Sequence, residues 1–126
     1  MKLDESNPRV RGDEQKLQQV LLNLLVNAEA AMQTTEVRHL SITTQSKQRM
    51  VQVIVSDTGH GMTPSISERV FEPFFTTKPP GEGTGLGLSV SYGIIQAHDG
   101  TISVESTPDV GTTFTVVLPL YREARK

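Results

Sequence analysis

The sequence predicts an α/β domain, because two kinds of periodicity alternate along its 126 residues. Apolar residues at three- and four-residue spacing predict amphipathic helices, and two pairs of short β-branched runs predict hairpins. A chain of this length can build a core without disulfides, and it contains no cysteine. We therefore expect residues 1–126 to form a single domain, with residues 121–126 as a charged, frayed end.

The first expected element is a long helix that begins near Gly12-Asp13-Glu14, where acidic groups suit the unpaired N–H groups of a first turn. Its apolar residues form one continuous stripe that should face the core. This stripe comprises Leu17, Val20, Leu21, Leu24, Leu25, Ala28, Ala31 and Met32. Asn23 and Asn27 lie four residues apart, so they should stack on a neighbouring face of the same helix.

Two antiparallel hairpins are expected from the β-branched runs. The expected strands span residues 40–44, 51–55, 101–105 and 112–118. The polar segment 46–49 should join the first pair, and the turn-forming segment 108–111 should join the second. The second strand of the first hairpin should end at Asp57.

Between the hairpins, the pattern returns to helices separated by a loop. The expected elements are a short helix over 64–70, a mobile lid loop rich in Gly, Pro and Thr over 76–85, and a helix over 87–98. The last of these should end at Gly100, where a left-handed cap is natural for glycine.

The composition argues against several classes of function. The net charge of −2 leaves no basic surface for nucleic acid. Hydrophobic runs stop well short of the roughly 20 residues that span a bilayer, so we expect a cytoplasmic, monomeric fragment without direct membrane contact. A membrane anchor of the parent protein would lie outside this sequence. The three histidines form neither a zinc cluster nor a catalytic triad, and we assign them no chemistry.

Two asparagines carry the first candidate chemistry. The side-chain carbonyl of Asn27 is a hard, neutral ligand suited to Mg²⁺, which keeps most of its waters and takes further oxygens from phosphates. Asn23 can support the same coordination shell. Taken alone, however, two asparagines on a helix are more often solvated polar residues, so the surrounding motifs must decide between these interpretations.

Asp57 ends a strand and precedes Gly59 and Gly61. Its carboxylate can accept a hydrogen bond from the amino group of adenine, while a glycine backbone lets the ring come close. Guanine would present a carbonyl group there and be repelled. The alternative for Asp57 is an ordinary Asx turn. Met62 and Ile66 are candidates either for lining the ring pocket or for the core.

The segment Gly83-Thr84-Gly85-Leu86-Gly87 opens a helix, where backbone N–H groups and the helix dipole favour an anion such as a phosphate. Its glycine spacing fits neither a dinucleotide fingerprint nor a Walker loop, and a plain flexible loop is the alternative. Lys78 is the nearest cation able to reach a terminal phosphate, although a lone lysine is more often a solvated charge. The cluster Phe71, Phe74 and Phe75 can anchor a lid hinge or plug the core beneath the loop.

In this order and spacing, the motifs resemble the catalytic, ATP-binding domain of bacterial sensor histidine kinases, within the gyrase, chaperone, histidine-kinase and mismatch-repair ATPase superfamily. Residues 13–32 are similar to the N box, 57–62 to the first glycine box, 70–78 to the F box, 83–88 to the second glycine box and 111–114 to the last box. The N box looks most like that of the nitrogen-regulation branch. The resemblance implies a two-layer α/β sandwich of the Bergerat type, with a mixed sheet covered on one face by helices.

The resemblance also implies roles for individual residues. Asn27 would bind Mg²⁺, Asp57 and Thr112 would surround adenine, and the glycine loop would hold the triphosphate. The expected nucleotide contacts are Asn27, Asp57, Gly59, Gly61, Met62, Phe75, Lys78, Gly83, Thr84, Gly85, Leu86, Gly87, Leu88 and Thr112. Catalysis is expected to depend on Asn23, Asn27 and Lys78.

Two departures from the family pattern bear on the reaction. Hydrolytic members of the superfamily carry a glutamate general base one helical turn before the magnesium asparagine, and here that residue is Asn23, which cannot take a proton. Many sensor kinases place a basic residue and a tyrosine where this chain has Ala30 and Ala31, which shifts phosphate neutralisation onto Lys78 or the metal. We therefore expect phosphoryl transfer to a protein in preference to rapid hydrolysis.

The expected function is transfer of the γ-phosphoryl group of ATP to a histidine on a separate, dimeric helical domain of a parent kinase, which would pass it to a response regulator. That acceptor domain is not in the sequence, so the chain should be an excised catalytic domain. Two alternatives remain: a conformational ATPase module of the gyrase or mismatch-repair kind, and a nucleotide sensor that binds ADP without transferring phosphate.

Overall fold

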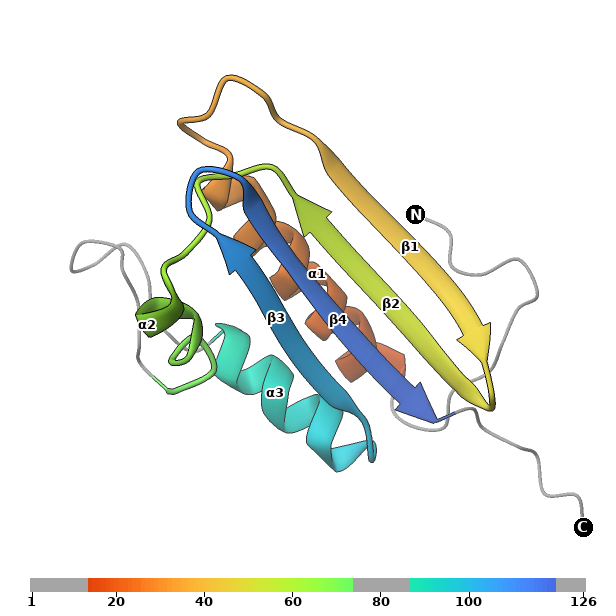
Figure 1. The fold of residues 1–126 in the computed structure, drawn as a ribbon. Helices are drawn as coiled ribbons and strands as arrows, with labels where there is room; N and C mark the ends of the chain where they lie inside the picture. Colours follow the sequence, from red (N-terminus) through yellow and green to blue (C-terminus); the bar gives the residue numbers. More distant parts are fainter. Residues whose placement is uncertain (1–13, 74–86, 120–126) are drawn as a thin grey trace, which may run out of the picture.

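The computed structural model describes residues 14–73 and 87–119, and these confirm the predicted α/β class (Figure 1). The elements are α1 (Glu14–Ala31), β1 (Leu40–Lys47), β2 (Met50–Asp57), α2 (Pro64–Ser67), α3 (Gly87–Ala97), β3 (Thr101–Thr107) and β4 (Gly111–Pro119). The helix α2 is shorter than the predicted helix over 64–70. The predicted helix start at residues 12 and 13 lies outside the described residues.

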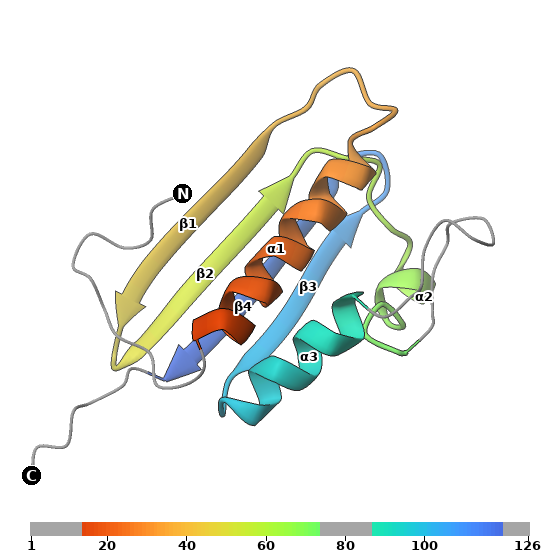
Figure 2. The same ribbon diagram turned by 180° about the vertical axis from the view of Figure 1, so that it is seen from behind.

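The strands form one sheet in the order β1-β2-β4-β3. Both α1 and α3 lie on the same face of this sheet, which confirms the predicted arrangement of two layers (Figure 2). All three described strand pairings are antiparallel. The prediction of a mixed sheet is therefore wrong for these four strands. Short turns require antiparallel pairing in the two hairpins, β1 with β2 and β3 with β4. The pairing of β2 with β4 is also antiparallel, although α2, α3 and β3 lie between these strands in the chain.

The first hairpin turns more tightly than predicted. β1 and β2 remain paired as far as Lys47 and Met50, so the loop contains only Gln48 and Arg49 instead of the whole segment 46–49. Both loop residues have a left-handed φ, 52° and 69°. Positive φ at both positions is typical of two-residue hairpin turns, because their twist matches that of the strands. The usual sequence signal for such a turn is Asn-Gly, which is missing here.

The end of α3 also differs from its prediction. The left-handed residue is Asp99, with a φ of 62°, and not Gly100. The Gly100 N–H bonds to the Ile95 carbonyl at 2.9 Å, as in a Schellman motif whose left-handed position is the residue before the glycine. Glycine is required at position 100 for another reason: a Cβ there would collide with the Val117 carbonyl of β4.

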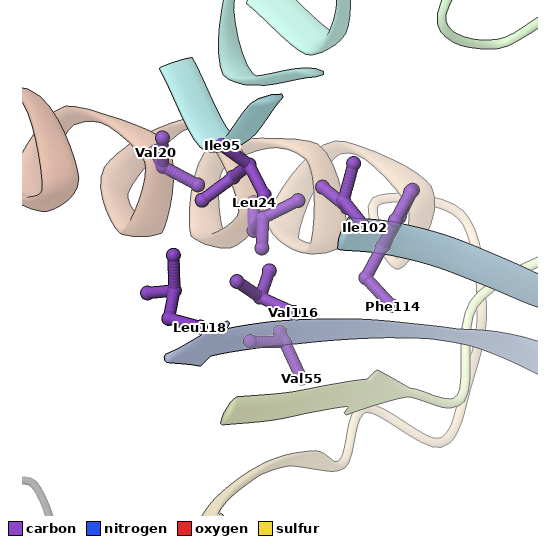
Figure 3. Close-up of a cluster of buried hydrophobic side chains, with 8 residues drawn as sticks. All are labelled: Val20, Leu24, Val55, Ile95, Ile102, Phe114, Val116 and Leu118. Carbon is purple, nitrogen blue, oxygen red and sulfur yellow. The ribbon is translucent and has the colours of Figure 1, made fainter. Parts of the chain in front are cut away.

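The core lies between the two longer helices and the sheet (Figure 3). Its buried side chains are Val20, Leu24, Val55, Ile95, Ile102, Phe114, Val116 and Leu118. The predicted apolar stripe of α1 is confirmed, since Leu17, Leu21 and Leu25 pack against this cluster. No helix in the described part of the chain is both long and apolar enough to span a membrane.

Candidate functional site

Asp57 lies at the end of β2, as predicted, and is only 5% exposed. It pairs across the sheet with Thr112 of β4, which is also buried. Its Oδ1 accepts a hydrogen bond of 2.8 Å from the Gly59 N–H, so the Asx turn that we gave as an alternative is present. This bond engages one carboxylate oxygen, and the group keeps acceptor capacity for a ligand.

The environment of Asp57 changes its acidity. Burial raises the pKa of its carboxyl group, and the N–H groups of Gly59 and Thr112 and the nearby His60 oppose this shift only in part. A buried carboxyl group with a perturbed pKa is a common feature of binding and catalytic sites. When ionised, it is also a stronger acceptor than a solvated carboxylate, because the surroundings have a low dielectric constant.

Gly59 and Gly61 are required by the packing of the backbone. A Cβ at Gly59 would lie 2.5 Å from the carbonyl oxygen of Ala31 in α1. Gly61 has a φ of +71°, and a Cβ there would collide with the carbonyl group of Thr107. Each glycine therefore has a steric reason that holds without a ligand. Their predicted role in admitting a base stays a prediction.

Ser106, near the end of β3, joins three segments at this end of the sheet. Its Oγ accepts the Met62 N–H at 2.8 Å, and it lies 3.1 Å from the Gly111 carbonyl oxygen and 2.8 Å from Thr112 Oγ1. Ser106 was not among the predicted residues. The sequence contained one indication of this role. Strand alternation places Ser106 on the core face, where a buried polar group needs a hydrogen-bond partner.

Asn23 connects α1 to the first turn of α3. Its Nδ2 donates to the Gly87 carbonyl at 3.1 Å and to Ser91 Oγ at 3.0 Å, while Ser91 Oγ donates to the same carbonyl at 3.0 Å. Ser91 is 0% exposed, so this network is inside the helix interface. The amide nitrogen of Asn23 therefore has a structural role in joining α1 to α3. Its support of a metal stays a prediction. Ser91 was not predicted, although it interrupts the apolar face of α3.

Asn27, one turn further along α1, is half-buried and makes no side-chain hydrogen bond with another described residue. Its carbonyl oxygen is therefore available to a cation. A single neutral oxygen fits Mg²⁺, which completes its shell with water and phosphate oxygens. Within residues 14–73 and 87–119, no three His, Cys, Asp or Glu side chains gather as a metal site.

Several predicted contacts cannot be placed on the fold. Phe75, Lys78, Gly83, Thr84, Gly85 and Leu86 lie outside the described residues, as does the predicted lid loop over 76–85. Gly87 is the first residue of α3, and Leu88 packs against the core. Phe71 contacts Tyr92 and Phe114, with ring centroids 5.5 and 6.2 Å apart, so the core plug is confirmed for this phenylalanine.

A hollow of about 340 Å³ is also present at this end of the sheet. Its lining includes Ser56, Glu105 and Thr113, whose positions alternate with those of Asp57 and Thr112. These three side chains therefore belong to the face opposite α1 and α3. Asp57 and Thr112, the predicted adenine contacts, also line the hollow, whereas no residue of α1 or α3 does.

Comparison with known proteins identifies the family. The sequence profile described as "Histidine kinase-, DNA gyrase B-, and HSP90-like ATPase" matches residues 12–122. The signal transduction histidine-protein kinase AtoS of Escherichia coli (strain K12) is 41% identical over 118 residues, which are 94% of this chain and 19% of AtoS. The chain thus spans about a fifth of the length of this relative.

Solved structures agree with this assignment. The nucleotide-free catalytic domain of histidine kinase ThkA has a TM-score of 0.78 at 36% identity, over 93% of this chain and 76% of that one. Full-length ShkA in complex with AMPPNP has a TM-score of 0.79 at 30% identity, over 93% of this chain and 24% of ShkA. The chain belongs to the histidine kinase-, DNA gyrase B- and HSP90-like ATPase family, and within it to the ATP-binding catalytic domains of sensor histidine kinases.

Proposed function

We propose that this chain binds ATP with Mg²⁺ and transfers the γ-phosphoryl group to a histidine on a separate helical domain of a larger kinase. The observation that carries the proposal is the junction of α1 and α3, where Asn23 binds the carbonyl group of Gly87 at 3.1 Å. This contact keeps the start of α3 against the asparagine face of α1. A helix N-terminus beside an available amide oxygen suits a metal-bound phosphate chain.

The individual roles follow from the chemistry of each group. Asn27 would hold Mg²⁺, which when bound neutralises phosphate charge. Asp57 would accept from the adenine amino group, next to Thr112. The N–H groups at Gly87 and the preceding loop would bind the phosphates. Phe75 and Lys78 are proposed as a lid hinge and a phosphate-binding cation.

Transfer is favoured over hydrolysis by the residue at position 23. The amide of Asn23 cannot act as a general base, and its nitrogen already donates to Gly87 and Ser91. Phosphoryl transfer needs little covalent help from the protein, so positioning and charge stabilisation supply most of the catalysis. The acceptor imidazole brings its own nucleophilic nitrogen.

The surrounding protein is also part of the proposal. Residues 1–126 would act as one catalytic domain, monomeric when isolated, on the cytoplasmic side of a parent that is itself free or membrane-anchored. Its partners would be the dimeric acceptor-histidine domain and, through that domain, a response regulator.

The test is a phosphotransfer assay in trans. The chain is mixed with the acceptor domain of its parent kinase and γ-labelled ATP, and the expected product is acid-labile, base-stable label on the acceptor. An acceptor domain with its histidine changed to glutamine is the matched control and should stay unlabelled.

Two other results would contradict the proposal. Steady ATP hydrolysis by the chain alone, without label on the acceptor and abolished by Asn23→Ala, would indicate a conformational ATPase. Binding of ADP or ATP with neither hydrolysis nor transfer would indicate a nucleotide sensor.

A further inference from the structure

The hydroxyl group of Ser106 is at the centre of a network that no motif in the sequence predicts. It lies within hydrogen-bond distance of the Met62 N–H, the Gly111 carbonyl and the Thr112 hydroxyl. These three groups come from the loop before α2 and from the first two residues of β4. Ser106 therefore fixes two of the predicted nucleotide contacts, Met62 and Thr112, relative to each other.

The chemistry of the partners allows one arrangement of protons in which all three contacts are hydrogen bonds. The Met62 N–H can only donate, and the Gly111 carbonyl can only accept. If Ser106 gives its single proton to Gly111, its two lone pairs accept from Met62 and from Thr112. In this arrangement each of the three contacts, at 2.8, 3.1 and 2.8 Å, is a proper hydrogen bond. The Thr112 hydroxyl then has no proton left for a ligand.

We propose that Ser106 is a positioning residue that sets base selectivity, because it accepts the hydrogen bond of the Thr112 hydroxyl and leaves the Thr112 oxygen to act toward a ligand as an acceptor only. Thr112 is paired across the sheet with Asp57, and both are buried. Two acceptors side by side suit a base edge that carries an amino group, directly or through water. They disfavour an edge that presents a carbonyl oxygen, as guanine does. This inference rests on the proposed binding of ATP.

The experiment measures the affinity of the whole chain for ATP and for GTP by calorimetry in the presence of Mg²⁺. Loss of one neutral hydrogen bond in Ser106→Ala should weaken ATP binding about fivefold. It should also reduce the preference for ATP over GTP, measured as the ratio of the two affinities. Thr112→Val removes the acceptor itself and should have a similar effect. Because both changes act on one hydroxyl pair, the double variant should lie within about twofold of Thr112→Val alone.

Three controls separate positioning from general damage to the fold. Ser103→Ala changes an exposed serine on the same strand and should leave both affinities unchanged. Ser106→Thr keeps a hydroxyl group and should restore the ratio. Ser106→Cys is close to serine in size but a poor hydrogen-bonding group, and it replaces the alanine variant if thermal unfolding shows that the latter is unfolded.

The outcomes distinguish this inference from the function on which it rests. Wild-type chain that binds neither nucleotide would overturn both. Wild-type chain that prefers ATP, with effects of Ser106→Ala and Thr112→Val that add in full, would overturn the inference alone. An unchanged ratio of affinities in Ser106→Ala and Ser106→Cys would also overturn it.

Discussion

The two ends of the sheet are built from opposite kinds of side chain. At one end Val51 pairs with Leu118, and both are almost fully buried. At the other end Asp57 pairs with Thr112, equally buried, beside the hydroxyl group of Ser106. In the described part of the chain, every buried side-chain nitrogen and oxygen has a hydrogen-bond partner. The buried polar groups at this end are therefore hydrogen-bonded within the protein.

This difference separates two tasks. Burial of apolar surface at the first end stabilises the fold, whereas burial of a carboxyl group at the second end costs desolvation energy. Natural proteins accept that cost where a buried acceptor has a use. We therefore expect substitutions at the apolar end to change stability without changing binding, and substitutions at the polar end to change binding with smaller or opposite effects on stability.

The largest effect is expected at the apolar end. Leu118→Ala removes a buried side chain and should lower the free energy of unfolding by about 2–5 kcal/mol, because of lost burial and a residual cavity. Urea denaturation followed by circular dichroism measures this change. The affinity for ATP should stay the same at a temperature where the variant is folded. A clear loss of affinity in the folded variant would show that the two ends are not independent.

A backbone change at the polar end should come next. Gly111 has a φ of +149°, and a Cβ there would collide with the carbonyl group of Asp57. Gly111→Ala should destabilise the fold by about 2–3 kcal/mol and should also weaken ATP binding. Gly93→Ala is the matched control, since its Cβ would meet nothing within 4 Å and glycine is unfavourable inside α3. That variant should gain about 0.5–1 kcal/mol of stability in the same denaturation experiment.

The sharpest contrast is expected at Asp57. Asp57→Asn keeps an oxygen for the Gly59 N–H and removes a buried charge, so the free energy of unfolding at neutral pH should stay equal or rise. The affinity for ATP should fall by about 1–3 kcal/mol, because a charge-assisted hydrogen bond is lost. Calorimetry and denaturation on the same preparation test both halves. Unchanged affinity would remove Asp57 from the binding site.

A smaller effect should appear as a pH dependence. Because the pKa of Asp57 is raised in the fold, the native state holds this proton more tightly than the unfolded chain does. Its contribution to stability is therefore fully present at low pH and is lost as the pH rises from the unfolded pKa through the folded pKa. ATP binding should change in the other direction, weakening as the carboxyl group becomes protonated.

Titrations of wild type and Asp57→Asn, compared over this interval, test the assignment. The difference in unfolding free energy between the two proteins should change with pH in this interval and become constant above the folded pKa of Asp57. A constant difference throughout would mean that another group is responsible for the pH dependence.

Local periodicity explains which parts of the fold were predictable. The core face of α1 and the end of β2 at Asp57 both follow from repeats within a short segment, and both are confirmed. The tight turn at Gln48 and Arg49 was not predictable, because it places two ordinary residues in the left-handed region. The cap of α3 was assigned to Gly100, whose real constraint is a contact with β4.

The polar networks depend on contacts that are distant in sequence. Asn23 and Ser91 are 68 positions apart and meet only when α1 packs against α3. Ser106 reaches Met62 and Thr112 only once β3 and β4 are in register. The sequence shows that polar residues such as Ser91 and Ser106 occupy positions that face the core. Their hydrogen-bond partners cannot be read from it, because they depend on the tertiary structure.

The side of the sheet that faces away from α1 and α3 offers a place for chemical labels. Ser103 is exposed there, and the chain has no cysteine of its own. A single thiol introduced by Ser103→Cys would therefore react alone with a maleimide dye. The sheet would separate the fluorophore from the helices, so the dye would not block a domain that docks onto the helical side. Energy transfer to a second dye on that domain could therefore be used to measure docking.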